Sequence, residues 1–175
     1  AGLIDDLLDA SRLQAGALAL DKGDVDVGPL LERQVARFRT QAESRRFVLD
    51  LPAKVPLIRG DEQRLTQVIA NLLSNAVKYS PDGSEIRVAL EASPAELVVC
   101  VSDEGRGIDP AEAPHVFERF YRSADVARST QGTGLGLFLA KAIVEAHGGR
   151  IWVDPRVRRG ARLCFSLPLD PALTP

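Results

Sequence analysis

DEQRLTQVIANLLSNAVKYS, residues 61–80, is the longest segment of the sequence with a clean helical period. Its apolar residues recur three or four positions apart, so they share one face of a helix expected from Asp61 to about Tyr79. At about 100° per residue, the polar side chains beside this face form one narrow row. The apolar face comprises Leu65, Val68, Ile69, Leu72, Leu73 and Ala76, and the row comprises Gln67, Asn71, Asn75 and Lys78.

This polar row combines residue types that suit a metal ion and its phosphate ligands. A neutral Asn oxygen suits Mg²⁺, which keeps several waters and shares its remaining positions with substrate phosphates. Lys78 would meet those phosphates as a point charge. Asn71, Asn75 and Lys78 are therefore candidate catalytic residues, and the two asparagines are candidate metal ligands. The same row also fits an ordinary solvated flank of a helix.

Two strands are predicted after this helix, over residues 85–92 and 97–102. The second strand is almost continuously apolar, which is typical of a strand buried in the middle of a sheet. Asp103 follows it directly, with glycines at positions 105 and 107. A carboxylate beside residues that lack Cβ can accept a hydrogen bond from a purine amine while the backbone approaches the ring. An ordinary Asp-Gly turn fits the same residues.

A second glycine cluster, GTGLGL at Gly132–Leu137, leads into a helix predicted over Leu135–His147. Each glycine inside a helix costs about 1 kcal/mol relative to Ala, so the cluster calls for a reason. Free backbone NH groups at the positive end of a helix dipole favour phosphate. The cluster is not a Walker loop, because no Lys-Ser or Lys-Thr pair follows, and it lacks the third glycine of a dinucleotide fingerprint. A plain glycine-rich turn is the alternative.

Residues 103–131 show little regular pattern, and an irregular segment of that length inside a compact domain is usually functional. Phe117–Arg122, with the letters FERFYR, leads into the polar residues 123–131. The aromatic side chains can anchor one end while the rest moves, as in a lid. Arg119 and Arg122 are candidates to bind a terminal phosphate when the lid closes, although plain surface charge also explains them.

The remaining regular segments alternate between helix and strand. A helix is predicted to open at Pro29, a favourable first position, and strands are predicted near residues 47–51, 150–153 and 161–167. Helices and strands mixed in this order predict an α/β or α+β two-layer sandwich.

Composition narrows the functional classes. A net charge of −2 over 175 residues gives no basic surface for nucleic acid, and no apolar run approaches the roughly 18 residues that cross a bilayer. Neither nucleic-acid binding nor membrane contact by this chain is therefore expected. Cys100 and Cys164 lie far apart in apolar strand-like runs, and we expect two reduced core residues.

The chain begins at Ala1 and contains no Met, so we expect it to be a segment of a longer protein. Leu3–Leu13 has the apolar period of an amphipathic helix, and the pattern fades from Gly16. A lone helix of this length is marginal in water, which predicts a helical partner upstream. Docking on the chain's own domain is the alternative.

Taken in chain order, these segments resemble the sequence boxes of sensor histidine kinases. This family belongs to an ATPase superfamily with DNA gyrase, the MutL repair proteins and a heat-shock chaperone. Asn71–Ser80 resembles the N box, Asp103–Ile108 the first glycine box, Phe117–Tyr121 the F box and Gly132–Leu137 the second glycine box. The resemblance covers nearly the whole chain. It implies the end of a dimerisation and phosphotransfer hairpin at 1–20, an ATP-binding catalytic domain at 21–170 and a tail at 171–175.

The resemblance implies a Bergerat-type fold, in which a mixed open sheet of about five strands is backed by three helices. ATP and Mg²⁺ would lie between the helices and the lid. Asn75 would be the metal ligand, Asn71 would help to position metal and phosphate, Tyr79 would pack near adenine, and Asp103 would bind its amino group. The other nucleotide-binding residues implied are Gly105, Gly107, Ile108, Gly132, Thr133, Gly134, Leu135 and Gly136. Ala161 stands where the family usually has Thr, which removes one polar contact near adenine.

The reaction implied is transfer of the γ-phosphoryl group of ATP to a histidine nitrogen. That histidine is expected upstream of Ala1, because His115 and His147 fit loop and helix-end positions. The implied partners are the dimerisation and phosphoacceptor helical domain of the parent kinase and a response regulator. The expected compartment of this chain is the cytoplasm. The parent protein could be anchored in the inner membrane or free of it. A nucleotide-binding regulatory module, or a serine kinase or ATPase of the same superfamily, is the alternative.

Overall fold

A computed structural model describes residues 19–122, 133–157 and 159–170. The helix predicted over residues 3–13, the tail 171–175 and residues 123–132 lie outside this part of the chain. The elements, in chain order, are β1 (Gly23–Val25), α2 (Val27–Gln41), β2 (Arg46–Asp50), β3 (Ile58–Gly60), α3 (Glu62–Tyr79), β4 (Glu85–Ala92), β5 (Glu96–Asp103), α5 (Gly136–Ala146), β6 (Arg150–Val153) and β7 (Arg162–Pro168).

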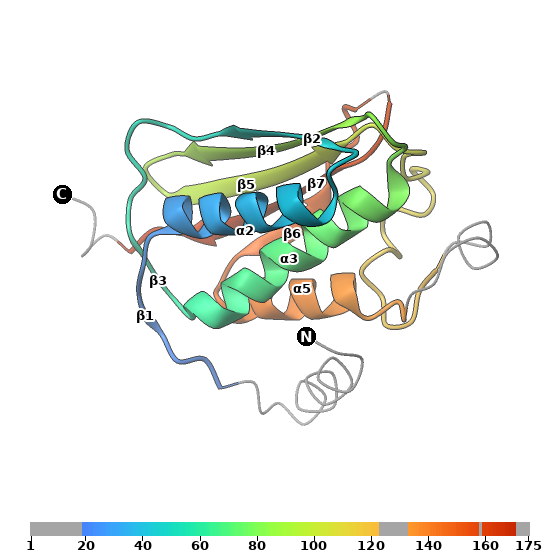
Figure 1. Cartoon of the computed structure of the whole chain (residues 1–175). Coiled ribbons are helices and arrows are strands. Elements are labelled where there is room, and N and C mark those ends of the chain that lie inside the picture. Colours follow the sequence, from blue (N-terminus) through green and yellow to red (C-terminus); the bar gives the residue numbers. More distant parts are fainter. Residues whose placement is uncertain (1–18, 123–132, 158, 171–175) are drawn as a thin grey trace.

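The strands form a five-stranded sheet in the order β2-β4-β5-β7-β6, and α2, α3 and α5 pack on one face of it (Figure 1). β2 runs parallel to β4, and the other neighbours in this sheet are antiparallel. β5 is the middle strand, as its apolar sequence predicts. The predicted two-layer α/β sandwich with an open mixed sheet is therefore confirmed. Within the described ranges, no helix is long and apolar enough to cross a membrane.

Helix α3 follows the predicted pattern closely. The Asp61 side chain caps its first turn by accepting a hydrogen bond from the Arg64 NH at 3.1 Å. The helix ends at Tyr79 because Ser80 is extended, as a residue before proline prefers to be. All six residues of the predicted apolar face are at most 2% exposed, so they fix the rotation of α3 against the sheet.

Helix α2 begins at Val27, two residues before the predicted start at Pro29. The Asp26 side chain accepts a hydrogen bond from the Gly28 NH at 3.1 Å and so caps the helix earlier. Pro29 then falls in the first turn, where a helical NH has no intrahelical partner and its loss costs little. The small sheet of β1 and β3 was not predicted, because three-residue strands show no measurable period.

The prediction of two reduced cysteines is wrong. Cys100 and Cys164 form a disulfide between β5 and β7, with their Cα atoms 4.1 Å apart. The two residues are 64 positions apart in sequence, yet the antiparallel register places them directly opposite each other. That register depends on the pairing of distant strands, which the local sequence around each cysteine does not indicate.

His147 is buried at the end of α5 and uses both ring nitrogens. Its Nδ1 lies 2.7 Å from the Ile143 carbonyl oxygen, and its Nε2 accepts a hydrogen bond from the Asp61 NH at 2.9 Å. Nε2 can accept a hydrogen bond only when it carries no proton, and the Ile143 carbonyl accepts only from a protonated Nδ1, so the ring is neutral. Burial lowers the pKa of His147 below its ordinary value of 6.5, with a smaller opposing effect from the bond to Ile143.

We expect the free energy of unfolding to decrease as the pH falls below about 6.5. His147 has a lower pKa in the folded than in the unfolded chain, so the unfolded chain binds a proton there first. The His147→Gln variant should lose this part of the pH dependence. His115→Gln should keep it, since His115 is exposed and pairs with Glu118 on the surface. Urea unfolding of the three proteins between about pH 7.5 and 5 measures the difference. Parallel curves for wild type and His147→Gln would contradict the assignment.

Candidate functional site

Helix α3 turns three residues of its polar row, Asn71, Asn75 and Lys78, toward a cavity of about 310 Å³, whereas Gln67 accepts a hydrogen bond from Arg64. The end of β5, the segment that follows it and the start of α5 complete the walls. This volume suits a small organic ligand. The cavity brings together most of the predicted site residues, namely Asn71, Asn75, Lys78, Tyr79, Asp103, Gly107, Ile108, Arg122, Thr133, Gly134 and Gly136.

Four predicted site residues are not placed in its walls. Gly105 packs against the Tyr79 carbonyl and lines a second cavity, and Leu135, directly before α5, is fully buried. The Arg119 guanidinium lies over the neighbouring phenyl ring, 4.6 Å from the ring centroid. Gly132 lies outside the described residues.

Sequence reasoning missed several wall residues, among them Ser74, Glu112, Val116 and Leu163. Ser74 had a usable signal, because it is three residues after Asn71 and four before Lys78 and so shares their side of the helix. Glu112 and Val116 lie in an irregular segment, where no period relates a residue to its neighbours in space.

Asn71 joins α3 to the first residue of α5. Its Nδ2 donates a hydrogen bond to the Gly136 carbonyl oxygen at 2.9 Å. An amide that donates there keeps its Oδ1 as an acceptor for another group. The start of α5 lies against this side chain, since a Cβ on Gly136 would be in van der Waals contact with it at 3.5 Å. The carboxamide therefore has a fixed orientation before any ligand binds.

Basic side chains surround Tyr79 at the end of α3. The Lys78 ammonium lies 5.1 Å from the centroid of the Tyr79 ring, and the Arg106 guanidinium carbon lies 5.9 Å from it. Arg106 and Arg122 also line the cavity. These three cationic side chains outnumber the two carboxylates of the cavity, those of Asp103 and Glu112, and favour an anionic ligand such as a phosphate chain.

Asp103 lies at the end of β5, where its carboxylate is held by backbone groups. Its Oδ1 accepts hydrogen bonds from the Gly105 NH at 2.8 Å and the Ala161 NH at 3.3 Å. Burial raises the pKa of Asp103 above its ordinary value, and these two hydrogen bonds partly oppose the shift. Oδ1 is thus fixed by the protein, and Oδ2 is the atom available to a ligand. Ala161 takes part through its NH, so this contact does not depend on the Thr usual at its position.

Two glycines permit this close packing around Asp103. A Cβ on Gly160 would lie 1.7 Å from the Asp103 carbonyl oxygen, and Gly160 has a φ of +75°. A Cβ on Gly105 would lie 2.5 Å from the Tyr79 carbonyl oxygen. Both distances are far too short for real contacts, so any side chain at either position would displace the Asp103 wall or the end of α3.

The segment after β5 is tied to the loop before α5. The Phe120 NH donates to the Gly134 carbonyl oxygen at 3.0 Å, while Phe117 is buried against the main core. Gly134 has a φ of +69°, and a Cβ there would lie 2.7 Å from the Phe120 backbone. Arg122 and Thr133 therefore reach the same cavity from two sides of one junction.

An open mixed sheet with helices on one face, and a basic cavity between the middle helix and glycine-rich loops, defines a nucleotide-binding α/β domain. Residues 60–171 match the family model of histidine kinase-, DNA gyrase B-, and HSP90-like ATPases. The chain belongs to this family, and the resemblance drawn from the sequence is confirmed.

Comparisons with individual proteins agree with the histidine kinase branch. The chain is 36% identical to the sensor histidine kinase WalK of Bacillus subtilis over 171 aligned residues. This alignment covers 95% of this chain and 28% of WalK. The mycobacterial sensor histidine kinase MprB has a similar structure, with a TM-score of 0.74 and 32% identity over 84% of this chain and 97% of that one. Full-length ShkA in complex with AMPPNP gives a TM-score of 0.86 and 27% identity over 98% of this chain and 36% of ShkA. The chain therefore spans less than a third of the length of WalK.

We expect Asp103→Asn to lower the affinity for an adenine nucleotide by about 10- to 100-fold, the range for losing a hydrogen bond to a charged group. The new amide would keep its oxygen on the two backbone NH groups and turn a donor toward the purine amine. The fold should survive, because a neutral side chain suits this partly buried position. Titration calorimetry with AMPPNP measures the change. Glu104→Gln, on the exposed neighbour, is the matched control. Equal affinities for wild type and Asp103→Asn would show that the carboxylate does not bind the base.

Proposed function

We propose that this chain binds Mg-ATP in the cavity beside α3 and transfers the γ-phosphoryl group to a histidine on a helical domain of a longer sensor kinase. The observation that carries the proposal is that carboxamides and a lysine from α3 line one cavity together with a partly buried carboxylate from β5. The 36% identity to a sensor histidine kinase and the AMPPNP bound in a structural relative support it.

The base of the nucleotide is proposed to lie against Asp103, Tyr79 and Ile108. Asp103 Oδ2 would accept a hydrogen bond from the exocyclic amine of adenine, because Oδ1 is occupied by backbone NH groups. Gly107 has a φ of +82° and presents only backbone on its side of the cavity, so a flat ring can approach closely.

The phosphates are proposed to meet the basic and glycine-rich walls. Lys78 and Arg122 would pair with phosphate oxygens, and the backbone NH groups of Thr133 and Gly134 before α5 would donate to them. Bound Mg²⁺ would neutralise charge on the phosphate chain. Asn75 and Asn71 would supply its protein ligands, and the fixed Asn71 amide already has its oxygen available for a hard cation.

The phosphoacceptor is proposed to be a histidine outside this chain. His147 is buried with both ring nitrogens hydrogen-bonded, so neither can attack a phosphorus atom. The Nδ1 atom of His115 pairs with Glu118, and its ring stacks on Tyr121, 5.9 Å between centroids. This domain would therefore position and polarise the phosphoryl donor, while a dimerisation and phosphoacceptor helical domain supplies the nucleophile.

A response regulator is proposed as the next acceptor of the phosphoryl group, and the cytoplasm as the compartment, because the reaction consumes ATP. Disulfides are rare in that compartment, so Cys100 and Cys164 would be an exception there. Alkylating free thiols before cell lysis, followed by mass analysis, shows whether the pair is oxidised where the protein works.

We expect Asn75→Asp to abolish phosphoryl transfer, because a carboxylate would add negative charge against the phosphates. The assay mixes the chain with radiolabelled ATP, Mg²⁺ and a separately produced helical domain that carries the acceptor histidine. Wild type should label that domain but not itself. Gln63→Ala, on the exposed face of the same helix, should behave as wild type.

The assignment of Asn75 would be contradicted if the Asn75→Asp variant labelled the helical domain at the wild-type rate. No transfer by wild type, when the intact parent protein is active, would reject the kinase role itself.

A further inference from the structure

The end of α3, which carries Lys78 and Tyr79 into the cavity, contains a backbone carbonyl that lacks its helical hydrogen-bond donor. Within a helix the Val77 carbonyl would accept a hydrogen bond from the NH of the residue four positions later. That residue is Pro81, which has no NH. A carbonyl left without a partner where water is excluded is costly, so the last turn of α3 needs a donor from elsewhere.

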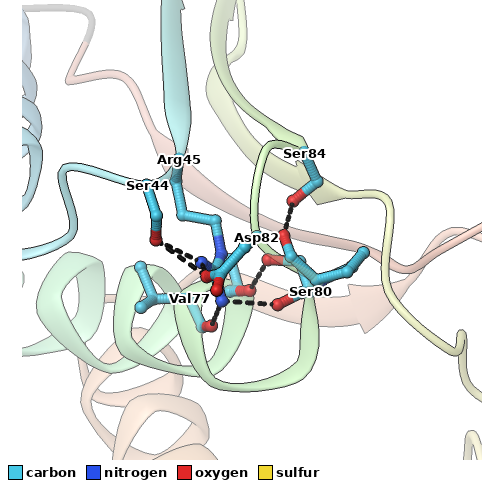
Figure 2. Close-up of polar contacts among 8 residues, drawn as sticks. Ser44, Arg45, Val77, Ser80, Asp82 and Ser84 are labelled. Atoms are coloured by element: carbon cyan, nitrogen blue, oxygen red, sulfur yellow. Dashed lines mark hydrogen bonds and ion pairs between the residues drawn. The ribbon is translucent and has the colours of Figure 1, made fainter.

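Arg45 supplies that donor from the turn between α2 and β2 (Figure 2). Its Nη2 donates to the Ser80 carbonyl oxygen at 2.7 Å and, with a longer contact, to the Val77 carbonyl oxygen at 3.4 Å. The side chain is only 12% exposed, although it carries a full charge. A guanidinium at the C-terminal end of a helix also meets the negative end of the helix dipole.

The other side of the guanidinium fixes Arg45 itself. Nη1 donates to the Ser44 hydroxyl at 2.6 Å and pairs with the Asp82 carboxylate. Ser44 Oγ donates in turn to Asp82 at 2.8 Å, and the Gly83 NH donates to the Ser44 carbonyl at 2.7 Å. Figure 2 shows the side-chain contacts of Ser44, Arg45 and Asp82 as one network around the turn after α3. Hydrogen bonds from Ser44 and Arg45 lower the pKa of Asp82, which therefore stays ionised.

We propose that Arg45 is a positioning residue of the nucleotide site, acting through the last turn of α3. Arg45 is not among the residues that line the cavity. Its two carbonyl partners, Val77 and Ser80, immediately flank Lys78 and Tyr79. The proposal rests on the proposed nucleotide function of that cavity.

The end of α3 is confined from two directions. Arg45 holds its carbonyls on the sheet-edge side, and Gly105 packs against the Tyr79 carbonyl from the other, at a distance that leaves no room for a Cβ. Without the guanidinium, the Val77 and Ser80 carbonyls would turn toward water. The intervening Lys78 and Tyr79 side chains would move with them, away from the phosphates and the base.

The role calls for arginine and not only for positive charge. The planar fork reaches two carbonyls with one end while its other end binds Ser44 and Asp82. A lysine offers one ammonium on a flexible stem and cannot hold both sides of the turn in one geometry. The expected order of nucleotide affinity is therefore wild type, then Arg45→Lys, then Arg45→Ala.

Calorimetric titration with Mg-AMPPNP, well below each protein's unfolding transition, tests this order. Arg45→Ala should raise the dissociation constant by about 3- to 30-fold, the range for residues that modulate a site without touching its ligand. Arg39→Ala is the matched control, because Arg39 also donates to a buried backbone carbonyl, that of Phe47, at 3.0 Å. It should lower the unfolding temperature similarly and leave the dissociation constant unchanged.

If the role of Arg45 is purely structural, Arg45→Ala and Arg45→Lys should unfold at lower temperatures than wild type. Both dissociation constants for Mg-AMPPNP would then stay within about twofold of the wild-type value, and the inference would be wrong. Should Arg45→Ala fail to fold, the milder Arg45→Lys decides the question by the same comparison. Failure of wild type itself to bind Mg-AMPPNP would instead reject the nucleotide assignment of the cavity, and the inference with it.

Discussion

The burial of one face of α3 against the sheet is the constraint on which the site depends. The six apolar side chains of that face are at most 2% exposed, and burying each large one contributes about 1.5 to 3 kcal/mol. Turning the helix by one residue would move these side chains into water, so its rotation is fixed. Asn71, Asn75 and Lys78 share the adjoining face, and the same burial therefore directs them into one cavity.

The opposite wall depends on backbone packing that tolerates no side chain. Asp103 is fixed by two NH groups, and one of them belongs to Ala161, directly after a glycine that touches the end of β5. Gly105 brings the same wall against the Tyr79 carbonyl. Close backbone contact thus places the carboxylate relative to the end of α3. This contact explains how β5 and α3 form a single cavity, although their residues are 24 or more positions apart in the sequence.

The sequence predicted the features that depend on neighbouring residues and missed those that depend on residues far apart in the chain. Periodic segments such as α3 and β4 carry their own signal in successive residues, and β4 was predicted with the bounds that the structure shows. The disulfide between Cys100 and Cys164 and the β1–β3 pair depend on register between distant segments. Glu112 reaches the cavity from an irregular segment, and Arg45 is one of 22 basic residues with no local pattern to mark it.

The two ends of α3 are held by side chains from distant parts of the chain. At its start, Asp61 caps the helix, accepts a hydrogen bond from the Asp21 NH and donates its own NH to His147, 86 residues away. At its end, Arg45 donates to the Ser80 carbonyl and to the Val77 carbonyl, which Pro81 leaves without a helical partner. The apolar face fixes the rotation of α3, while these contacts fix its ends. Because close-packed interiors transmit strain, we expect a change at either end to reach the cavity without any contact with a ligand.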